Sequence, residues 1–81
     1  MDSHLDQPPA APLPDVAPQG TARITAIAAE GDDAVRLKAL GLCVGRRVQL
    51  IQNGDPLIVR VLGARVGLSA RLAAVVYTEA S

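Results

Sequence analysis

LKALGLCVGRRVQL, residues 37–50, contains the end of a helix, two glycines and the start of a strand. Leu37 and Leu40 are three residues apart, so they share one helical face. Gly41 stands where a helix end needs a positive φ, which glycine adopts without a Cβ clash. In the Schellman ending that this predicts, Leu42 packs back onto Leu37. The stretch therefore predicts a corner through which a helix and a sheet share one apolar core.

The strand after this corner predicts a hairpin. Beyond a tight turn at Gly45, Val48 and Leu50 alternate with polar residues, as in a half-buried strand. Asn53-Gly54 then separates two apolar runs, which is the strongest short-range hairpin signal. A turn centred there puts the apolar residues of both strands on one face. The pairs that this register predicts are Gln52 with Asp55, Leu50 with Leu57, Val48 with Val59, and Arg47 with Arg60.

The complete pattern predicts a small, mainly β domain of about five strands. Asp32 or Asp33 offers an N-cap carboxylate for one short helix after the first strand, and Ser69 caps a helical turn before the last strand. Short strands separated by glycine turns favour a strongly bent barrel, because closure removes exposed sheet edges. The expected elements are a strand at 21–27, a helix at 34–40, strands at 48–52, 57–62 and 66–68, a helical turn at 70–74 and a strand at 75–77.

Residues 1–19 differ in composition from the rest of the chain. They hold five prolines and few large apolar side chains. Such a segment buries too little apolar surface to offset the cost of ordering it. We therefore predict a disordered Pro-rich tail over residues 1–19 and one folded domain over residues 20–81. The domain holds all eight Lys and Arg residues and is mildly basic, which favours an acidic protein partner.

Composition excludes several classes of function. The chain has no Phe or Trp and one Tyr, so it lacks an aromatic platform for nucleic acid. A single cysteine excludes an internal disulfide and a multi-cysteine zinc site, and it fits a reducing cytosol. No apolar run approaches the length of a membrane span, so we expect no direct membrane insertion.

Catalytic and metal-binding patterns are equally sparse. The only histidine, His4, lies in the predicted tail, and no Ser, Cys or Thr of the domain has a partner base. Cys43 is a candidate thiolate ligand for a soft metal ion, although a lone Cys in an apolar corner is more often a small buried hydrophobe. Arg47 and Arg60 either splay into water or form a spot for an acidic surface. These observations argue against an enzyme and indicate an interaction or regulatory module.

From Gly20 onward the chain resembles the ferrous iron transport protein A (FeoA) family. The resemblance covers nearly all of residues 20–78 and is carried by the order and spacing of short motifs. Ser69 departs from it, because Arg is usual there. The matching residues are Gly20, Ile24, Ile27, Leu37, Leu40, Gly41, Leu42, Gly45, Val48, Leu50, Gly54, Asp55, Pro56, Leu57, Val61, Gly63, Val66, Leu68, Leu72, Ala73 and Val76.

The resemblance implies an SH3-like β-barrel and a small, non-enzymatic accessory protein of bacterial ferrous iron uptake. The implied partner is a large membrane iron permease with a cytoplasmic GTP-binding domain. The implied location is the cytoplasm, at the inner face of the membrane through that partner. A related form of the domain ends metal-dependent transcription repressors. We expect the stand-alone form, since residues 1–19 cannot supply a winged helix.

The candidate partner-binding residues lie at the helix–strand corner and at basic strand positions. They are Leu42, Cys43, Val44, Arg46, Arg47, Arg60 and Arg65. Two alternatives stay open. One is a small protein that binds Fe2+ or another transition metal through Cys43, His4 and tail carboxylates. The other is an SH3-like interaction module unrelated to iron, which would bind proline-rich ligands poorly without an aromatic groove.

Overall fold

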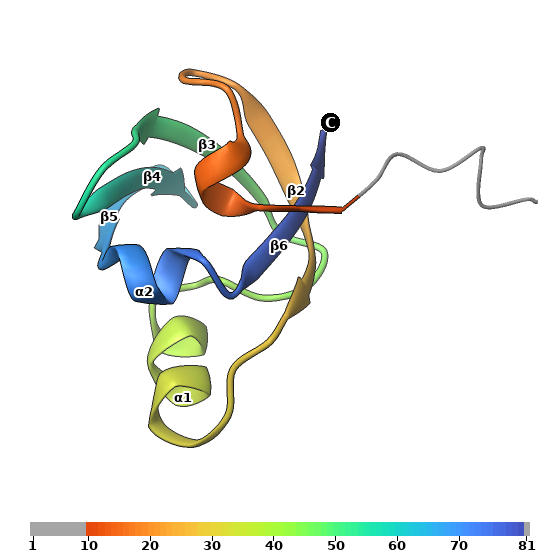
Figure 1. Ribbon diagram of the computed structural model, residues 1–81, viewed down its shortest axis with the longest axis vertical. Coiled ribbons are helices and arrows are strands. Elements are labelled where there is room, and N and C mark those ends of the chain that lie inside the picture. Colours follow the sequence, from red (N-terminus) through yellow and green to blue (C-terminus); the bar gives the residue numbers. More distant parts are fainter. Residues whose placement is uncertain (1–9, 81) are drawn as a thin grey trace, which may run out of the picture.

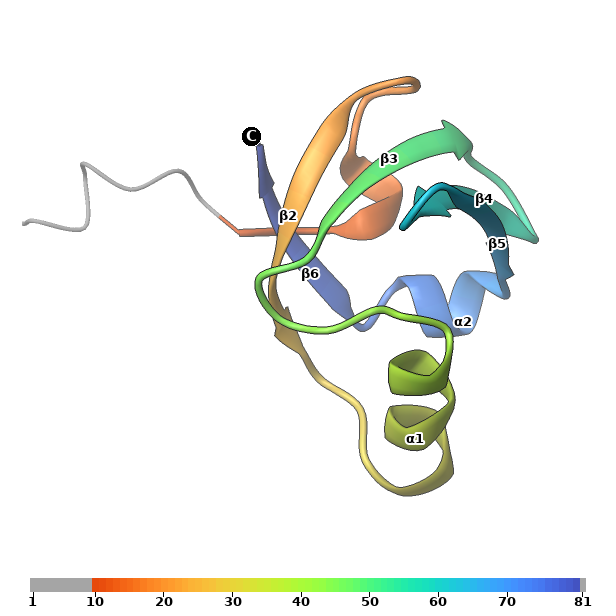
Figure 2. The ribbon, with the colours of Figure 1, turned by 180° about the vertical axis from the view of Figure 1, so that it is seen from behind.

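The computed structural model describes residues 10–80 as one antiparallel sheet with short helices (Figure 1). Its elements are β1 (Ala11–Pro12), the 3-10 helix η2 (Leu13–Asp15), β2 (Thr21–Ile27), α1 (Gly31–Ala39), β3 (Arg47–Gln52), β4 (Leu57–Val61), β5 (Ala64–Leu68), α2 (Ala70–Ala73) and β6 (Val76–Ala80). The strand order is β1-β6-β2-β3-β4-β5. The sheet curls around the core, and α1 projects from one end of it (Figure 2).

The five predicted strands are present as β2 to β6, so the mainly β prediction is confirmed. The sheet is open, with β1 and β5 as its two edges, so pairing between strands does not close the barrel. β5 begins earlier than predicted because the turn before it is Leu62-Gly63, where both residues have positive φ, 53° and 82°. That is a two-residue hairpin turn of type I′. No helix among residues 10–80 is long and apolar enough to cross a membrane.

The helix–strand corner has the predicted Schellman geometry. The Gly41 N–H donates to the Lys38 carbonyl at 3.0 Å, and the Leu42 N–H donates to the Leu37 carbonyl at 3.0 Å. Gly41 has a φ of 92°. Leu37 and Leu42 are 0% and 1% exposed and belong to the same core. Leu37 is the one buried residue of α1, so this corner is the helix's main hold on the sheet.

The N-terminal boundary of the domain corrects the sequence prediction. Ala11 and Pro12 pair with β6, and the Thr78 hydroxyl donates to the Ala11 carbonyl at 3.1 Å. Leu13 is fully buried in the core. The Gln19 N–H also donates to the Leu50 carbonyl at 2.7 Å, so both ends of the proline-rich segment are bonded to the sheet. The domain therefore includes residues 11–19, whereas residues 1–9 lie outside the described residues.

The register between β3 and β4 also differs from the prediction. Leu50 pairs with Val59 and Gln49 with Arg60, and the register shifts between Leu50 and Gln52. The connection spans residues 53–56 instead of a two-residue turn. Its side chains make tertiary hydrogen bonds: Asn53 Nδ2 donates to the Pro14 carbonyl at 2.7 Å, and Asp55 Oδ1 accepts from the Ala70 N–H at 3.1 Å. Gln49 is therefore opposite Arg60 in place of Arg47, and on the other side of β3 Arg47 pairs with Arg23 of β2.

The corner makes a testable prediction about Gly41. A Cβ at this position would lie 3.3 Å from Val61 Cγ1, in addition to the strain of a positive φ. Gly41→Ala should lower the free energy of unfolding by at least ~1–2 kcal/mol in urea denaturation. Gly45→Ala is the matched control, because Gly45 has the same φ of 92° but no atom within 4 Å of its Cβ. Equal losses in the two variants would show that the contact with Val61 is unimportant.

The burial of Leu13 makes a second prediction. Leu13→Ala should destabilise the fold by about 2–5 kcal/mol, the usual cost of emptying a fully buried leucine site. Leu62→Ala, at a leucine that is 72% exposed, should change stability by less than about 0.5 kcal/mol. Thermal and urea unfolding would check both. A Leu13→Ala variant as stable as the parent would mean that the N-terminal segment is not part of the cooperative fold.

Candidate protein-interaction surface

The predicted contact residues at the corner separate into buried and exposed side chains. Leu42 is 1% exposed, so it stabilises the core and leaves the set of candidate contacts. Val44 is 63% exposed. Cys43 is half-buried with a free thiol, and Arg46 Nη2 lies 3.6 Å from its sulfur as a donor. At this corner, a partner could therefore reach Val44 and the edge of the Cys43–Arg46 pair.

The described residues give little support to the alternative that this protein binds a metal ion. Residues 10–80 contain no group of three or more His, Cys, Asp or Glu side chains that could hold a metal ion. The polar neighbour of the Cys43 sulfur is a guanidinium, which repels a cation. His4, together with Asp2 and Asp6 of the predicted tail, lies outside the described residues.

Three of the four predicted arginines are brought together on one face of the sheet. Gln49 on β3 is directly opposite Arg60 on β4, and Arg60 is directly opposite Arg65 on β5. Arg47 is two residues before Gln49, so it lies on the same face, diagonal to Arg60. The apolar neighbours Val48, Leu50 and Val59 point the other way, into the core. We call the outward side chains of Arg47, Arg60 and Arg65 the arginine face.

The charges of the arginine face are not neutralised within the described part of the chain. All three guanidinium-bearing residues are exposed, and the ion pairs found among residues 10–80 involve other arginines. Arg23, opposite Arg47, is paired with Glu79. Like charges directly opposite each other in a sheet are unfavourable by a few tenths of a kcal/mol or more. The opposed residues Arg60 and Arg65 carry that cost, and no ion pair among residues 10–80 offsets it.

An exposed apolar residue lies at the end of the same β4–β5 hairpin. Leu62 is 72% exposed and has a φ of 53°, a conformation that leucine seldom adopts. Its Cδ1 lies 3.6 Å from the position of a Cβ built on Gly41, so the hairpin tip reaches the helix–strand corner. Sequence reasoning missed Leu62 because it placed the turn one residue later. Leu62-Gly63 between two apolar runs was the available signal.

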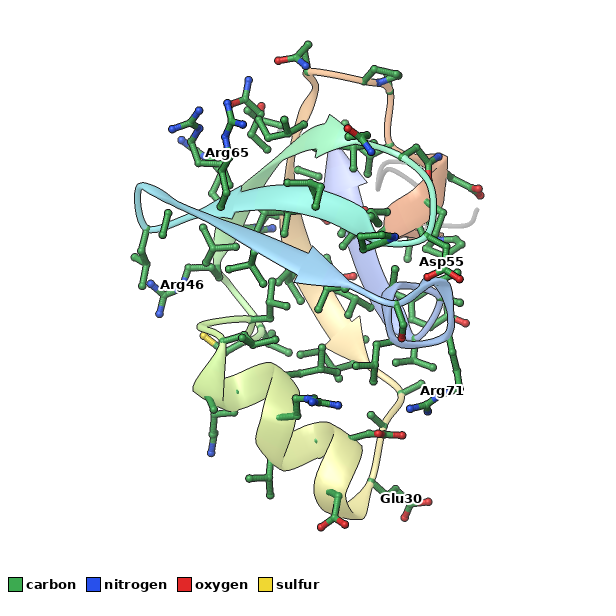
Figure 3. All side chains as sticks on the ribbon, turned by 90° about the vertical axis from the view of Figure 1, so that its left-hand side faces the viewer. Glu30, Arg46, Asp55, Arg65 and Arg71 are labelled. Atoms are coloured by element: carbon green, nitrogen blue, oxygen red, sulfur yellow. The ribbon has the colours of Figure 1, made fainter. Side chains whose placement is uncertain are left out.

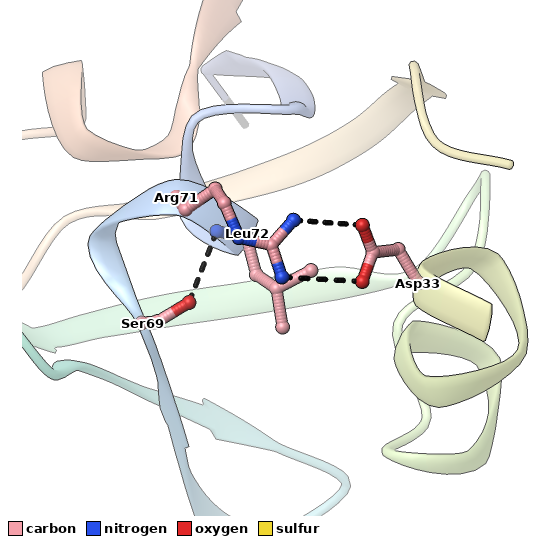
Figure 4. Close-up of polar contacts among 4 residues, drawn as sticks. All are labelled: Asp33, Ser69, Arg71 and Leu72. Atoms are coloured by element: carbon pink, nitrogen blue, oxygen red, sulfur yellow. Dashed lines mark hydrogen bonds and ion pairs between the residues drawn. The ribbon is translucent and has the colours of Figure 1, made fainter.

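The two helices are joined by an ion pair that the sequence did not predict. Arg71 donates two hydrogen bonds to the Asp33 carboxylate, at 2.7 and 3.3 Å (Figure 4). Asp32 or Asp33 was expected to cap α1, but the N-cap is Glu30 and makes no side-chain cap bond. The expected Ser69 cap of α2 is confirmed, since its hydroxyl accepts from the Leu72 N–H at 3.2 Å. The ion pair therefore ties α1 to α2 on the side away from the corner.

This ion pair predicts a pH dependence. The hydrogen bond from Arg71 is the main cause that lowers the pKa of Asp33 below its ordinary value. A depressed folded-state pKa means that the pair stabilises the fold above the unfolded-state pKa. That stabilisation is lost as the pH falls through the folded-state pKa. An NMR titration of the Asp33 carboxyl should give a low pKa that rises toward the ordinary value in Arg71→Gln. An unchanged pKa in that variant would show that the pair does not form in solution.

Solved structures with the same fold include small FeoA proteins and the longer protein IdeR. An iron uptake regulatory protein (FeoA) is 24% identical, with a TM-score of 0.80, and the match covers 88% of this chain and 96% of that one. The FeoA protein from Chlorobium tepidum is 25% identical, with a TM-score of 0.76 and coverages of 84% and 68%. IdeR from T. acidophilum is 25% identical, with a TM-score of 0.82 and coverage of 89% of this chain. The match spans only 34% of IdeR, so this chain resembles about a third of that longer protein.

Sequence comparison assigns the family. No curated protein matches the chain significantly. The family model described as the FeoA domain matches residues 11–80, which includes the N-terminal segment that sequence reasoning left out of the domain. The matched region contains the corner, the arginine face and both edge strands. The chain belongs to the FeoA domain family.

Proposed function

We propose that this chain is a non-enzymatic accessory protein of ferrous iron transport that acts by contacting a membrane iron permease. Family membership supports the link to iron, as does the fold shared with a structure named as an iron uptake regulatory protein. The observation that carries the contact is the arginine face: three exposed arginines on one sheet face without ion pairs among the described residues.

The chemistry of this face selects an acidic partner surface. Arginine forms bidentate hydrogen bonds with carboxylates, and a cluster of arginines raises the rate of encounter with negative charge. Exposed contacts of this kind give modest affinity that weakens with salt, because each charge stays partly solvated. The cytoplasmic GTP-binding domain of the permease is the partner that the family implies. A reversible, salt-sensitive contact suits a regulatory role better than a permanent complex.

The arginine face can be tested with charge-matched variants. The test variant is Arg47→Gln, Arg60→Gln and Arg65→Gln together. The control is Arg36→Gln, Lys38→Gln and Arg71→Gln together, which removes the same charge from the helices α1 and α2 and leaves the sheet unchanged. Calorimetric titration with the permease's purified GTP-binding domain should show a loss of roughly tenfold in affinity for the test variant, or about 1.4 kcal/mol, and little change for the control.

Salt gives an independent check on the same complex. Raising the ionic strength from about 0.05 M to about 0.3 M should weaken binding of the parent protein and leave the weak binding of the test variant nearly unchanged. Equal losses in the two variants would point to net charge instead of the arginine face. Unchanged binding in both would overturn the proposal.

A further inference from the structure

The two edges of the sheet differ in their capacity to bind another strand. β1 is two residues long and ends in Pro12, and short edges with proline resist pairing. β5 is five residues long, and its register with β4 runs without a shift from Leu57 with Leu68 to Val61 with Ala64. β5 is not short and contains no bulge or proline, which are features that prevent an edge strand from pairing with another strand.

The backbone of β5 carries unpaired groups on this edge. Val61 and Ala64 flank the two-residue turn, so they form a hydrogen-bonded pair, and alternate β5 residues point their backbone groups toward β4. Arg65 and Gly67 therefore point their N–H and C=O groups away from β4. Among residues 10–80, no side chain and no backbone group outside the sheet ladder bonds to either residue. Both residues are exposed. The edge is open and accessible.

Side chains around this edge favour one kind of occupant. A strand beside β5 places a side chain next to Arg65 on the arginine face, at a Cβ separation of about 4.5–5.5 Å, where a carboxylate is favourable. Two positions further along the added strand, a side chain lies next to Gly67, which has no Cβ. A Cβ built on Gly67 would lie 3.5 Å from Ile58 Cδ1, so the surroundings of this position are apolar. That position favours an apolar side chain. Pairing of two β5 strands from two copies would instead bring their arginines together on one face.

We propose that β5 accepts an extended acidic segment of the partner protein as an added strand of the sheet. An acidic residue lies next to Arg65, and an apolar residue two positions away lies over Gly67. Figure 3 shows β5 crossing the molecule, with Arg65 and Arg46 at its hairpin end and Asp55 at its α2 end. The acidic residue of the added strand therefore lies toward the hairpin end of β5. This inference rests on the proposed function, because it gives the form in which the permease's acidic surface is bound.

Amide hydrogen exchange can detect the added strand directly. The probe is a synthetic peptide of about eight residues in which Asp and Val stand two positions apart on one face, with Thr at the positions between them, and its control has Lys in place of Asp. On binding of the Asp–Val peptide to the labelled protein, exchange at the Arg65 and Gly67 amides should slow by about tenfold or more. The Lys–Val peptide should have no such effect. Binding without protection of these two amides would mean a purely electrostatic contact and would overturn the inference.

Variants at Gly67 separate the backbone contact from the charge. Gly67→Pro removes the N–H that faces the free edge, and proline is tolerated there because this N–H bonds nothing in the sheet. Gly67→Ala is the control, because it keeps the N–H and its Cβ lies at van der Waals distance from Ile58. Gly67→Pro should weaken the peptide by about tenfold or more, and Gly67→Ala by less than about twofold. Should Gly67→Pro fail to fold, a peptide N-methylated on the amides that face β5 tests the same contact, and full binding by it overturns the inference.

The permease domain decides between this inference and the proposed function. Binding that depends on the arginine face but protects neither the Arg65 nor the Gly67 amide would leave the proposed function intact and remove the added strand. Peptide addition to β5 without any binding of the permease domain would support the added strand and overturn the proposed function. Protection that grows with protein concentration alone would show pairing between two copies, against the charge argument.

Discussion

The hydrogen bond from the Leu42 N–H to the Leu37 carbonyl fixes the corner that connects helix α1 to the sheet. A nine-residue helix is too short to be stable by itself in water, so α1 depends on its attachment to the sheet. Gly41 makes that attachment possible because its positive φ turns the chain back and brings Leu42 into the core beside Leu37. The ion pair between Asp33 and Arg71 adds a second hold, at the surface, where a single exposed pair contributes little.

The core explains why the surface can carry unfavourable charge. It is built almost entirely from Leu, Ile, Val and Ala, with Thr78 as a buried polar residue whose hydroxyl is hydrogen-bonded. No buried side-chain polar atom in residues 10–80 lacks a partner. A small core of this kind stabilises the sheet from the inner face alone. The outer face of β3, β4 and β5 is therefore free to place arginines next to one another, at a modest cost in stability.

The two edges of the sheet, β1 and β5, differ in how they are covered. The N-terminal segment covers one end of the sheet: β1 pairs with β6, and Leu13 fills the core beneath. Nothing among the described residues does this for β5. The arginines on β4 and β5 make the open edge unattractive to a second copy while leaving it complementary to negative charge. A free edge and a cationic face on the same strand thus point to a single kind of ligand.

The sequence alone determined the corner, the aliphatic core and the mainly β fold, because these follow from local spacing, glycine positions and apolar alternation. It could not place residues 11–19, whose proline-rich composition is typical of disorder. What orders them is a contact between Leu13 and residues distant in the chain. The sequence pattern also predicted that Arg47 lies opposite Arg60, because an Asn-Gly pair favours a two-residue turn. Only the tertiary structure decided that register, because a shift after Leu50 and the bonds from Asn53 and Asp55 to Pro14 and Ala70 lengthen the loop. The local pattern therefore named the arginines and put Arg47 and Arg60 on one face. The tertiary structure moved Arg47 to a position diagonal to Arg60 and placed Arg65 opposite Arg60, because strand pairing depends on the lengths of the loop and the turn.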